Sequence, residues 1–147
     1  MKDFVFSNTN KRYHTLDYYY KEKFHSKVFK ISLNAGFSCP NLDGTVGFGG
    51  CIYCSKTGSG EFAGCKEDSL KQQFDNIKKI MLKKWPSGKF IGYFQARTNT
   101  YADVNILKKL YETVLSFDNV IGLNIATRPD SISEECLDFL IELNKKT

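Results

Sequence analysis

Two kinds of apolar segment alternate along this chain, and the alternation limits its fold more than any other feature. Short apolar runs that fit β-strands lie at residues 28–33, 90–94 and 120–126. Each is followed, after a connection, by a segment with apolar residues at helical spacing: residues 69–85, 104–117 and the stretch after Ser131. Strands that alternate with helices favour parallel pairing through right-handed crossovers. The sequence therefore predicts an α/β fold with a parallel sheet.

The helical segments also predict their own core faces. In the first two, the inward residues are Leu70, Phe74, Ile77 and Met81, then Val104, Leu107, Leu110, Tyr111 and Val114. Ser69 and Gln72 are spaced for a capping box, and Ser131 and Glu134 are spaced for another at the third helix. For that third helix we expect the inward residues to be Cys136, Leu137, Leu140 and Ile141.

Polar residues follow every predicted strand at its carboxyl end, as in barrel folds. They are a cysteine-rich loop, residues 95–101 and residues 127–130. A doubly wound sheet would place Gly-x-Gly-x-x-Gly after its first strand, and the glycines near residues 47–50 do not fit that spacing. We therefore predict a parallel-stranded partial TIM-like barrel with about three β/α units.

A complete barrel needs about 250 residues, so three units are either part of a longer barrel, a short natural form or a half-barrel. A half-barrel would be a possible homodimer, because a second copy would cover its open sheet edge. Residues 1–26 are expected to be an N-terminal extension packing on the core, and residues 27–147 the N-terminal part of the barrel.

Three cysteines lie in the glycine-rich loop after the first strand. Cys51 and Cys54 are close enough for one turn to aim both sulfurs at one metal centre, and Cys39 reaches it if the loop folds back. Thiolates are soft ligands that suit iron–sulfur clusters or zinc. Three of them would leave one iron of a four-iron cluster open to a small molecule. In the reducing cytoplasm, clustered cysteines more often bind metals or take part in catalysis than form disulfides.

Cys65 supports a second hypothesis, because a fourth thiol would complete a four-cysteine zinc site in a nucleic-acid-binding module. Zinc ribbons usually contain two tight Cys-x-x-Cys knuckles, and this chain has only the one at Cys51 and Cys54. Cys65 is thus either a ligand or a spare thiol, and Cys136 fits a core position. A non-catalytic iron–sulfur fragment is the third alternative.

Residues 27–44, 49–54, 93–102 and 122–130 together resemble a bacterial family of radical S-adenosylmethionine (SAM) proteins related to the catalytic subunit of Elongator. The resemblance implies a 4Fe-4S cluster on Cys39, Cys51 and Cys54, with SAM at the open iron. It further implies an enzyme of oxidoreductase or transferase type that reductively cleaves SAM to a 5'-deoxyadenosyl radical. A reductant such as flavodoxin or ferredoxin would supply the electron, and RNA is a possible substrate.

The same resemblance implies residues that bind the cofactor. Tyr53 would lie beside the adenine of SAM, or pack the loop on the sheet, and Gln95 or Asn99 would meet its amino group. Thr127 and Arg128 follow the third strand. Arg128 could hold a carboxylate or phosphate through its planar fork, or pair with Asp130 to fix a turn.

The remaining expectations concern the surface charge, the N-terminal segment and the cellular location of the protein. The net charge is +5, with many of the lysines in the first thirty residues, which suits either RNA contact or a solvated basic surface. A short helix is expected within residues 8–26, whose aromatic residues either stack on bases or pack on the core: Tyr18, Tyr19, Tyr20 and Phe24. Neither a secretory signal nor a membrane-spanning run is expected, which predicts a cytoplasmic protein without a membrane partner.

Overall fold

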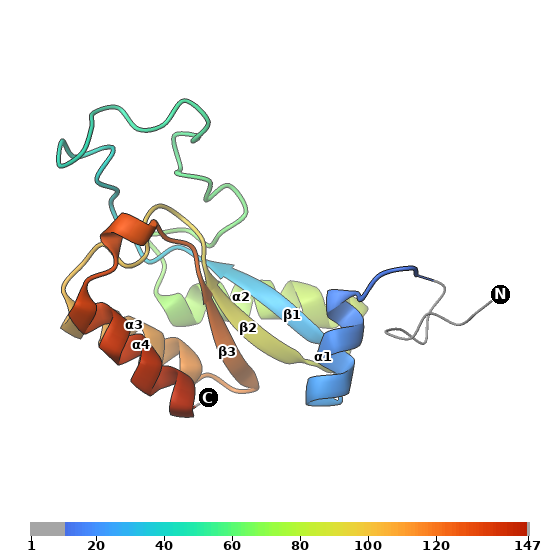
Figure 1. The fold of residues 1–147 in the computed structure, drawn as a ribbon. Coiled ribbons are helices and arrows are strands. Elements are labelled where there is room, and N and C mark those ends of the chain that lie inside the picture. Colours follow the sequence, from blue (N-terminus) through green and yellow to red (C-terminus); the bar gives the residue numbers. More distant parts are fainter. Residues whose placement is uncertain (1–10, 147) are drawn as a thin grey trace.

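The computed structural model describes residues 11–146, so the first ten residues of the predicted N-terminal extension lie outside the described part. Helices and strands alternate as expected after one leading helix (Figure 1). In chain order they are α1 (Leu16–Phe24), β1 (Val28–Leu33), α2 (Leu70–Lys84), β2 (Lys89–Phe94), α3 (Val104–Leu115), β3 (Val120–Ile125) and α4 (Glu134–Lys146). A short 3-10 turn, Pro129–Ser131, lies between β3 and α4.

The three strands form one parallel sheet in the order β1-β2-β3. Leu33 lies opposite Phe94, and Phe94 lies opposite Ile125, so the carboxyl ends of all three strands are level. The loop of residues 34–69 extends beyond these ends (Figure 1). The prediction of an α/β fold with a parallel sheet is confirmed, and in the described residues the sheet is open.

The core lies on one face of the sheet. Alternate strand residues, Phe29, Ile31 and Leu33 in β1 with Phe90 and Phe94 in β2, pack against Phe74 of α2 and against Leu107 and Tyr111 of α3. Side chains alternate between faces along a strand, so α2 and α3 cover the same face. The opposite face carries the exposed Lys30, the half-buried Tyr93 and the exposed Asn124. These polar side chains therefore lie on the face of the sheet that neither α2 nor α3 covers.

The predicted faces of α2 and α3 are confirmed, since all nine predicted inward residues belong to the core or pack against it. The capping box of Ser69 and Gln72 is also present. Apolar residues at i, i+3 and i+4 fix these faces because each helix has a single wide apolar stripe.

The predicted face of α4 is partly wrong. Leu137 and Ile141 are 45% and 48% exposed, whereas Cys136, Phe139 and Leu143 are buried. Phe139 stacks on the ring of Tyr111, with centroids 6.1 Å apart, which turns this stripe toward α3. The helix start also differs from the prediction, because Ser133 takes the capping role expected of Ser131 and its hydroxyl accepts from the Cys136 N–H at 3.1 Å.

The short helix predicted within residues 8–26 is present as α1, which lies beside the amino-terminal part of β1 (Figure 1). Thr15 caps it by accepting from the Tyr18 N–H at 3.1 Å, and His25 ends it with a φ of 49°. None of its residues is fully buried. Across residues 11–146, no helix combines the length and the apolar character needed to cross a membrane.

Candidate functional site: a thiol-lined cavity

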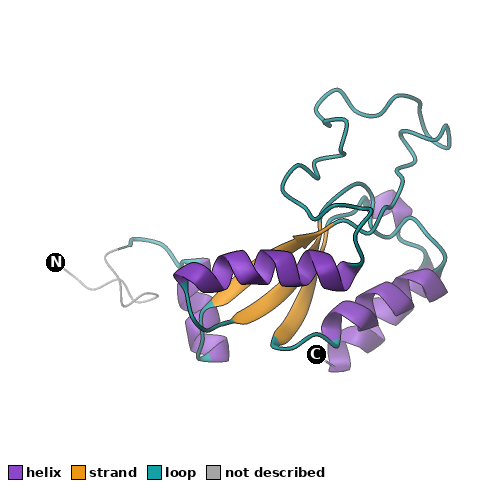
Figure 2. Ribbon diagram, turned by 180° about the vertical axis from the view of Figure 1, so that it is seen from behind, coloured by secondary structure: helices purple, strands orange, loops and turns teal. Residues whose placement is uncertain are grey.

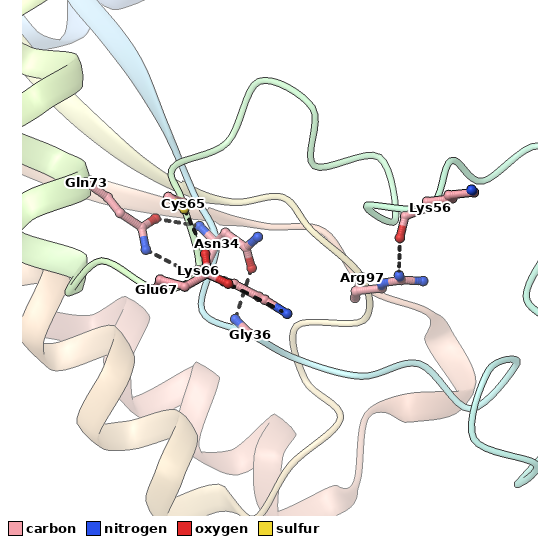
Figure 3. A network of polar contacts seen from close by, with 8 residues as sticks. All are labelled: Asn34, Gly36, Lys56, Cys65, Lys66, Glu67, Gln73 and Arg97. Carbon is pink, nitrogen blue, oxygen red and sulfur yellow. Dashed lines mark hydrogen bonds and ion pairs between the residues drawn. The ribbon is translucent and has the colours of Figure 1, made fainter.

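The loop between β1 and α2 is held to the carboxyl end of the sheet by two sets of contacts. The first is centred on Gln73 of α2, which is only 2% exposed. Its side-chain amide donates to the carbonyl of Asn34 at 2.9 Å, and its carbonyl oxygen accepts from the Asn34 N–H at 2.9 Å (Figure 3). The same amide donates to the carbonyl of Asp68 at 3.0 Å. Gln73 therefore joins the start of the loop to its end.

The second set comes from the segment after β2. Gln95 donates its side-chain N–H to the carbonyl of Ser59 at 2.7 Å. Arg97 donates through its guanidinium to the carbonyl of Lys56 (Figure 3) and through its backbone N–H to that of Gly58 at 3.0 Å. Its φ of 66° is unusual for a residue with a side chain. These bonds fix the middle of the loop over the end of β2.

A cavity of about 750 Å³ lies between this loop and the strand ends. The loop contributes Cys39, Cys51 and Cys54 to its lining. The segments after β2 and β3 contribute further polar side chains: Gln95, Arg97, Thr98, Thr127, Arg128 and Asp130. The three thiols that the sequence singled out therefore face one space together with residues from both neighbouring strands.

The thiol of Cys51 is set in a polar environment that favours its ionised form. The Tyr53 hydroxyl and the Asn41 amide both hydrogen-bond to it and lower its pKa, with Asn41 Nδ2 2.9 Å from the sulfur. The same contact raises the pKa of Tyr53. Hydrogen bonds to a charged form stabilise it, so both contacts favour the thiolate form of Cys51.

Arg128 pairs with Asp130 across Pro129, as the turn interpretation expected. Its Nε and Nη2 donate to the two carboxylate oxygens at 2.9 and 2.6 Å. This pairing, together with the nearby Cys39, raises the pKa of the guanidinium, and Arg128 lowers the pKa of Asp130. The bidentate pair stiffens the rim of the cavity beside Cys39.

The structure places four of the five predicted cofactor contacts around the cavity: Tyr53, Gln95, Thr127 and Arg128. Asn99 is different, because it is fully buried and does not line the cavity. Its amide donates to the carbonyl of Ala126 at 2.8 Å, while its Oδ1 lacks a hydrogen-bond partner within the described residues. Asn99 thus joins the segments after β2 and β3 from behind the cavity.

Sequence reasoning missed Asn41 and Arg97. Asn41 lies within the cysteine loop and Arg97 lies three residues after the end of β2, where parallel sheets commonly place functional groups. Their position along the chain was therefore a usable signal, but their roles depend on how the loop folds back.

The donor set fits a thiolate-bound group in type and location. Within residues 11–146, however, no group of three or more histidine, cysteine or acidic side chains is arranged to hold a metal ion. Cys65 is not part of the cavity; it lines a neighbouring one and donates its S–H to the carboxylate of Glu67, with the sulfur 2.7 Å from the oxygen. The three cavity cysteines are therefore the candidate set, and Cys65 stands apart from them.

Proteins from two bacteria and an archaeon are similar to this chain. The chain is 54% identical over 144 residues to the protein YtqA of Bacillus subtilis (strain 168), an alignment that covers 98% of this chain and 45% of the relative. It is 40% identical over 130 residues to the protein MJ0486 of Methanocaldococcus jannaschii, covering 84% of this chain and 38% of the relative. With the protein YhcC of Escherichia coli (strain K12) it shares 36% identity over 120 residues, 82% of this chain and 38% of the relative.

The chain thus spans less than half the length of each of these relatives, and none of their names states an activity. No protein-family model matches the sequence. No solved structure matches it either.

Proposed function

We propose that this chain carries the cluster-binding part of a radical SAM enzyme. The observation that carries the proposal is that Cys39, Cys51 and Cys54 line one cavity at the carboxyl end of a parallel sheet. Metal-binding groups commonly reach their final positions only when the metal binds. A loop that contains no helix and no multi-residue strand suits such closure.

A 4Fe-4S cluster held by three thiolates would supply the reductive cleavage of SAM at its open iron. The chain's own contribution is to prepare and enclose that site. Asn41 and Tyr53 stabilise the thiolate of Cys51. Tyr53 is 82% exposed, so its ring is available to cover an adenine. Gln95 and Arg97 hold the middle of the loop over the end of β2.

The proposed wider architecture is a partial TIM-like barrel. Two observations support it: α2 and α3 pack on one face of the sheet, and segments after all three strands meet at the cavity. The chemistry requires a reductant of the flavodoxin or ferredoxin type and a reducing compartment, for which we propose the cytoplasm. For the substrate we propose RNA. This choice rests only on the resemblance to a family related to the catalytic subunit of Elongator.

The test is anaerobic reconstitution of the chain with iron and sulfide, followed by electron paramagnetic resonance of the reduced protein with and without SAM. We expect a four-iron signal that changes when SAM is added. Substituting alanine for Cys39, Cys51 or Cys54 should abolish cluster loading. Cys65→Ala is the matched control, since it removes a thiol from the same loop but from another cavity.

The other outcomes separate the alternatives. A signal that ignores SAM would indicate a non-catalytic iron–sulfur fragment. Tight zinc binding that is lost in Cys65→Ala would replace the proposal with the four-cysteine zinc module.

A further inference from the structure

Four lysines gather around two aromatic rings at the amino end of the sheet. Two ammonium groups lie over the ring of Trp85, that of Lys27 at 4.2 Å and that of Lys84 at 4.7 Å from its centroid. Two more lie over the ring of Phe24, that of Lys23 at 5.2 Å and that of Lys89 at 6.0 Å. We call these four lysines and two rings the lysine–aromatic patch.

The patch is built from three parts of the fold. Lys23 and Phe24 end α1, and Lys84 and Trp85 end α2. Lys27 and Lys89 lie at the starts of β1 and β2, where the Lys89 N–H donates to the Lys27 carbonyl at 2.9 Å. Figure 2 shows α1 and one end of α2 together at the amino ends of the strands, on the side opposite the long loop.

These charges are not neutralised by the protein. None of the four lysines takes part in an ion pair among residues 11–146, where the pairs involve Lys21, Lys66, Lys71 and Arg128 instead. Two like charges over one ring repel each other, at a cost that an anion placed between them would remove. The rings hold the ammonium groups by cation–π attraction and so reduce the entropy lost when an anion binds.

The position of the patch narrows the choice of partner. It lies at the amino ends of the strands, whereas the thiol cavity lies at their carboxyl ends; six-residue strands of about 3.3 Å per residue separate them by roughly 20 Å. An acidic reductant docked on the patch would hold its redox centre far from the cysteines. An extended polyanion needs no such proximity.

The burial of the two aromatic rings narrows the choice of partner further. Phe24 and Trp85 are half-buried beneath their lysines and do not project as membrane-inserting wedges. Lysine ammonium groups act as point charges that suit phosphate oxygens. We propose that the lysine–aromatic patch binds the phosphate backbone of single-stranded RNA. The proposal does not depend on the cluster chemistry proposed above.

The experiment measures the binding of a fluorescein-labelled, mixed-sequence single-stranded RNA to the full chain by anisotropy over a series of salt concentrations. The patch variant replaces Lys23, Lys27, Lys84 and Lys89 with glutamine. The matched control replaces Lys108, Lys109, Lys145 and Lys146 of α3 and α4 with glutamine, which removes the same charge elsewhere. No cluster is loaded, so failure of this test would leave the proposed cluster binding and SAM cleavage standing, and failure of the cluster test would leave this proposal standing.

We expect the patch variant to bind RNA at least about tenfold more weakly. The slope of log K against log salt should become shallower by about 3, since each phosphate contact on a single strand contributes about 0.7. The control variant should stay close to the parent in both quantities. Equal losses in the two variants would overturn the proposal, as would equally tight binding of the parent to polyglutamate.

A second measurement uses the unsubstituted chain and therefore does not depend on the folding of any variant. Acetylation of lysines, read by mass spectrometry with and without the RNA, should show protection of Lys27, Lys84 and Lys89. Protection confined to other lysines would contradict the proposal. Binding to phosphatidylserine vesicles through the same lysines, without RNA binding, would replace it with a membrane surface.

Discussion

Gln73 is the single side chain that joins both ends of the long loop to the helix behind it. Its amide makes three hydrogen bonds to backbone groups while being almost wholly buried. We predict that Gln73→Leu lowers the free energy of unfolding by roughly 2–4 kcal/mol, because it leaves three partly buried backbone groups without their hydrogen-bond partner. Urea denaturation measures this loss. Asn76→Leu, at an exposed position of the same helix, should change stability far less, and equal losses would contradict the role given to Gln73.

Tyr111 makes stability sensitive to alkaline pH. Its hydroxyl is buried and donates to the carbonyl of Asn99, and burial raises its pKa above the ordinary value of 10. The unfolded chain therefore loses this proton at a lower pH than the folded chain does. The stabilisation is complete below pH 10 and is lost above it, by up to about 1.4 kcal/mol per pH unit.

Comparing the parent with Tyr111→Phe isolates this effect, because every other titrating group is shared. The variant should be less stable near neutral pH, by about 1 kcal/mol for the lost hydrogen bond. Above pH 10 the difference between the two proteins should shrink. A difference in unfolding free energy that stays constant from neutral to alkaline pH would show that Tyr111 titrates normally in the fold.

At the scale of elements, the middle of the long loop depends on a glycine. Gly58 has a φ of +66°, and a Cβ added there would clash with Cδ of Arg97. We predict that Gly58→Ala weakens the Arg97 contacts and costs more than the roughly 1–2 kcal/mol expected from the left-handed backbone alone. Gly36→Ala is the matched control, since Gly36 has a φ of +75° with open space around it.

Thermal unfolding and limited proteolysis together test this difference. Gly58→Ala should lower the melting temperature more than Gly36→Ala does and should expose the loop around residues 55–60 to protease. Identical behaviour of the two variants would mean that backbone strain, not the contact with Arg97, explains the glycine.

The sequence correctly predicted the buried face of each helix that has a single stripe of apolar residues. In α3, the apolar residues Leu107, Tyr111 and Val114 lie on one face and no second apolar face competes with it. Their helical spacing alone therefore identifies the face that packs into the core. Helix α4 carries two overlapping stripes, one through Phe139 and one through Leu137 and Ile141. Only the stacking of Phe139 on Tyr111 chooses between them, and that contact joins residues far apart in the sequence.

The candidate site divides in the same way. The cysteines and the residues after each strand were predictable, because spacing and parallel topology place them at one end of the sheet. The hydrogen bonds from Asn41 to Cys51 and from Arg97 to the carbonyl of Lys56 were not predictable. Both depend on the path of a loop that lacks periodic structure, and hydrophobic pattern says nothing about such a path.

At the scale of the whole molecule, β3 is one of the two edge strands that the described residues form. It pairs only with β2 among residues 11–146, and every residue in it except the exposed Asn124 is only half-buried. An unpaired strand edge offers free N–H and C=O groups to another chain. We predict that this chain self-associates through β3 in solution, which is the half-barrel pairing that the sequence left open as one of three alternatives.

Sedimentation velocity over a wide range of protein concentration tests this prediction. The parent chain should shift toward dimers or larger species as concentration rises. Asn124→Lys should stay monomeric, because a charge on an edge strand opposes pairing with a second copy. Asn144→Lys makes the same chemical change on the exposed surface of α4 and should associate like the parent. If the parent is monomeric at every concentration, the open edge of β3 does not drive assembly of this chain.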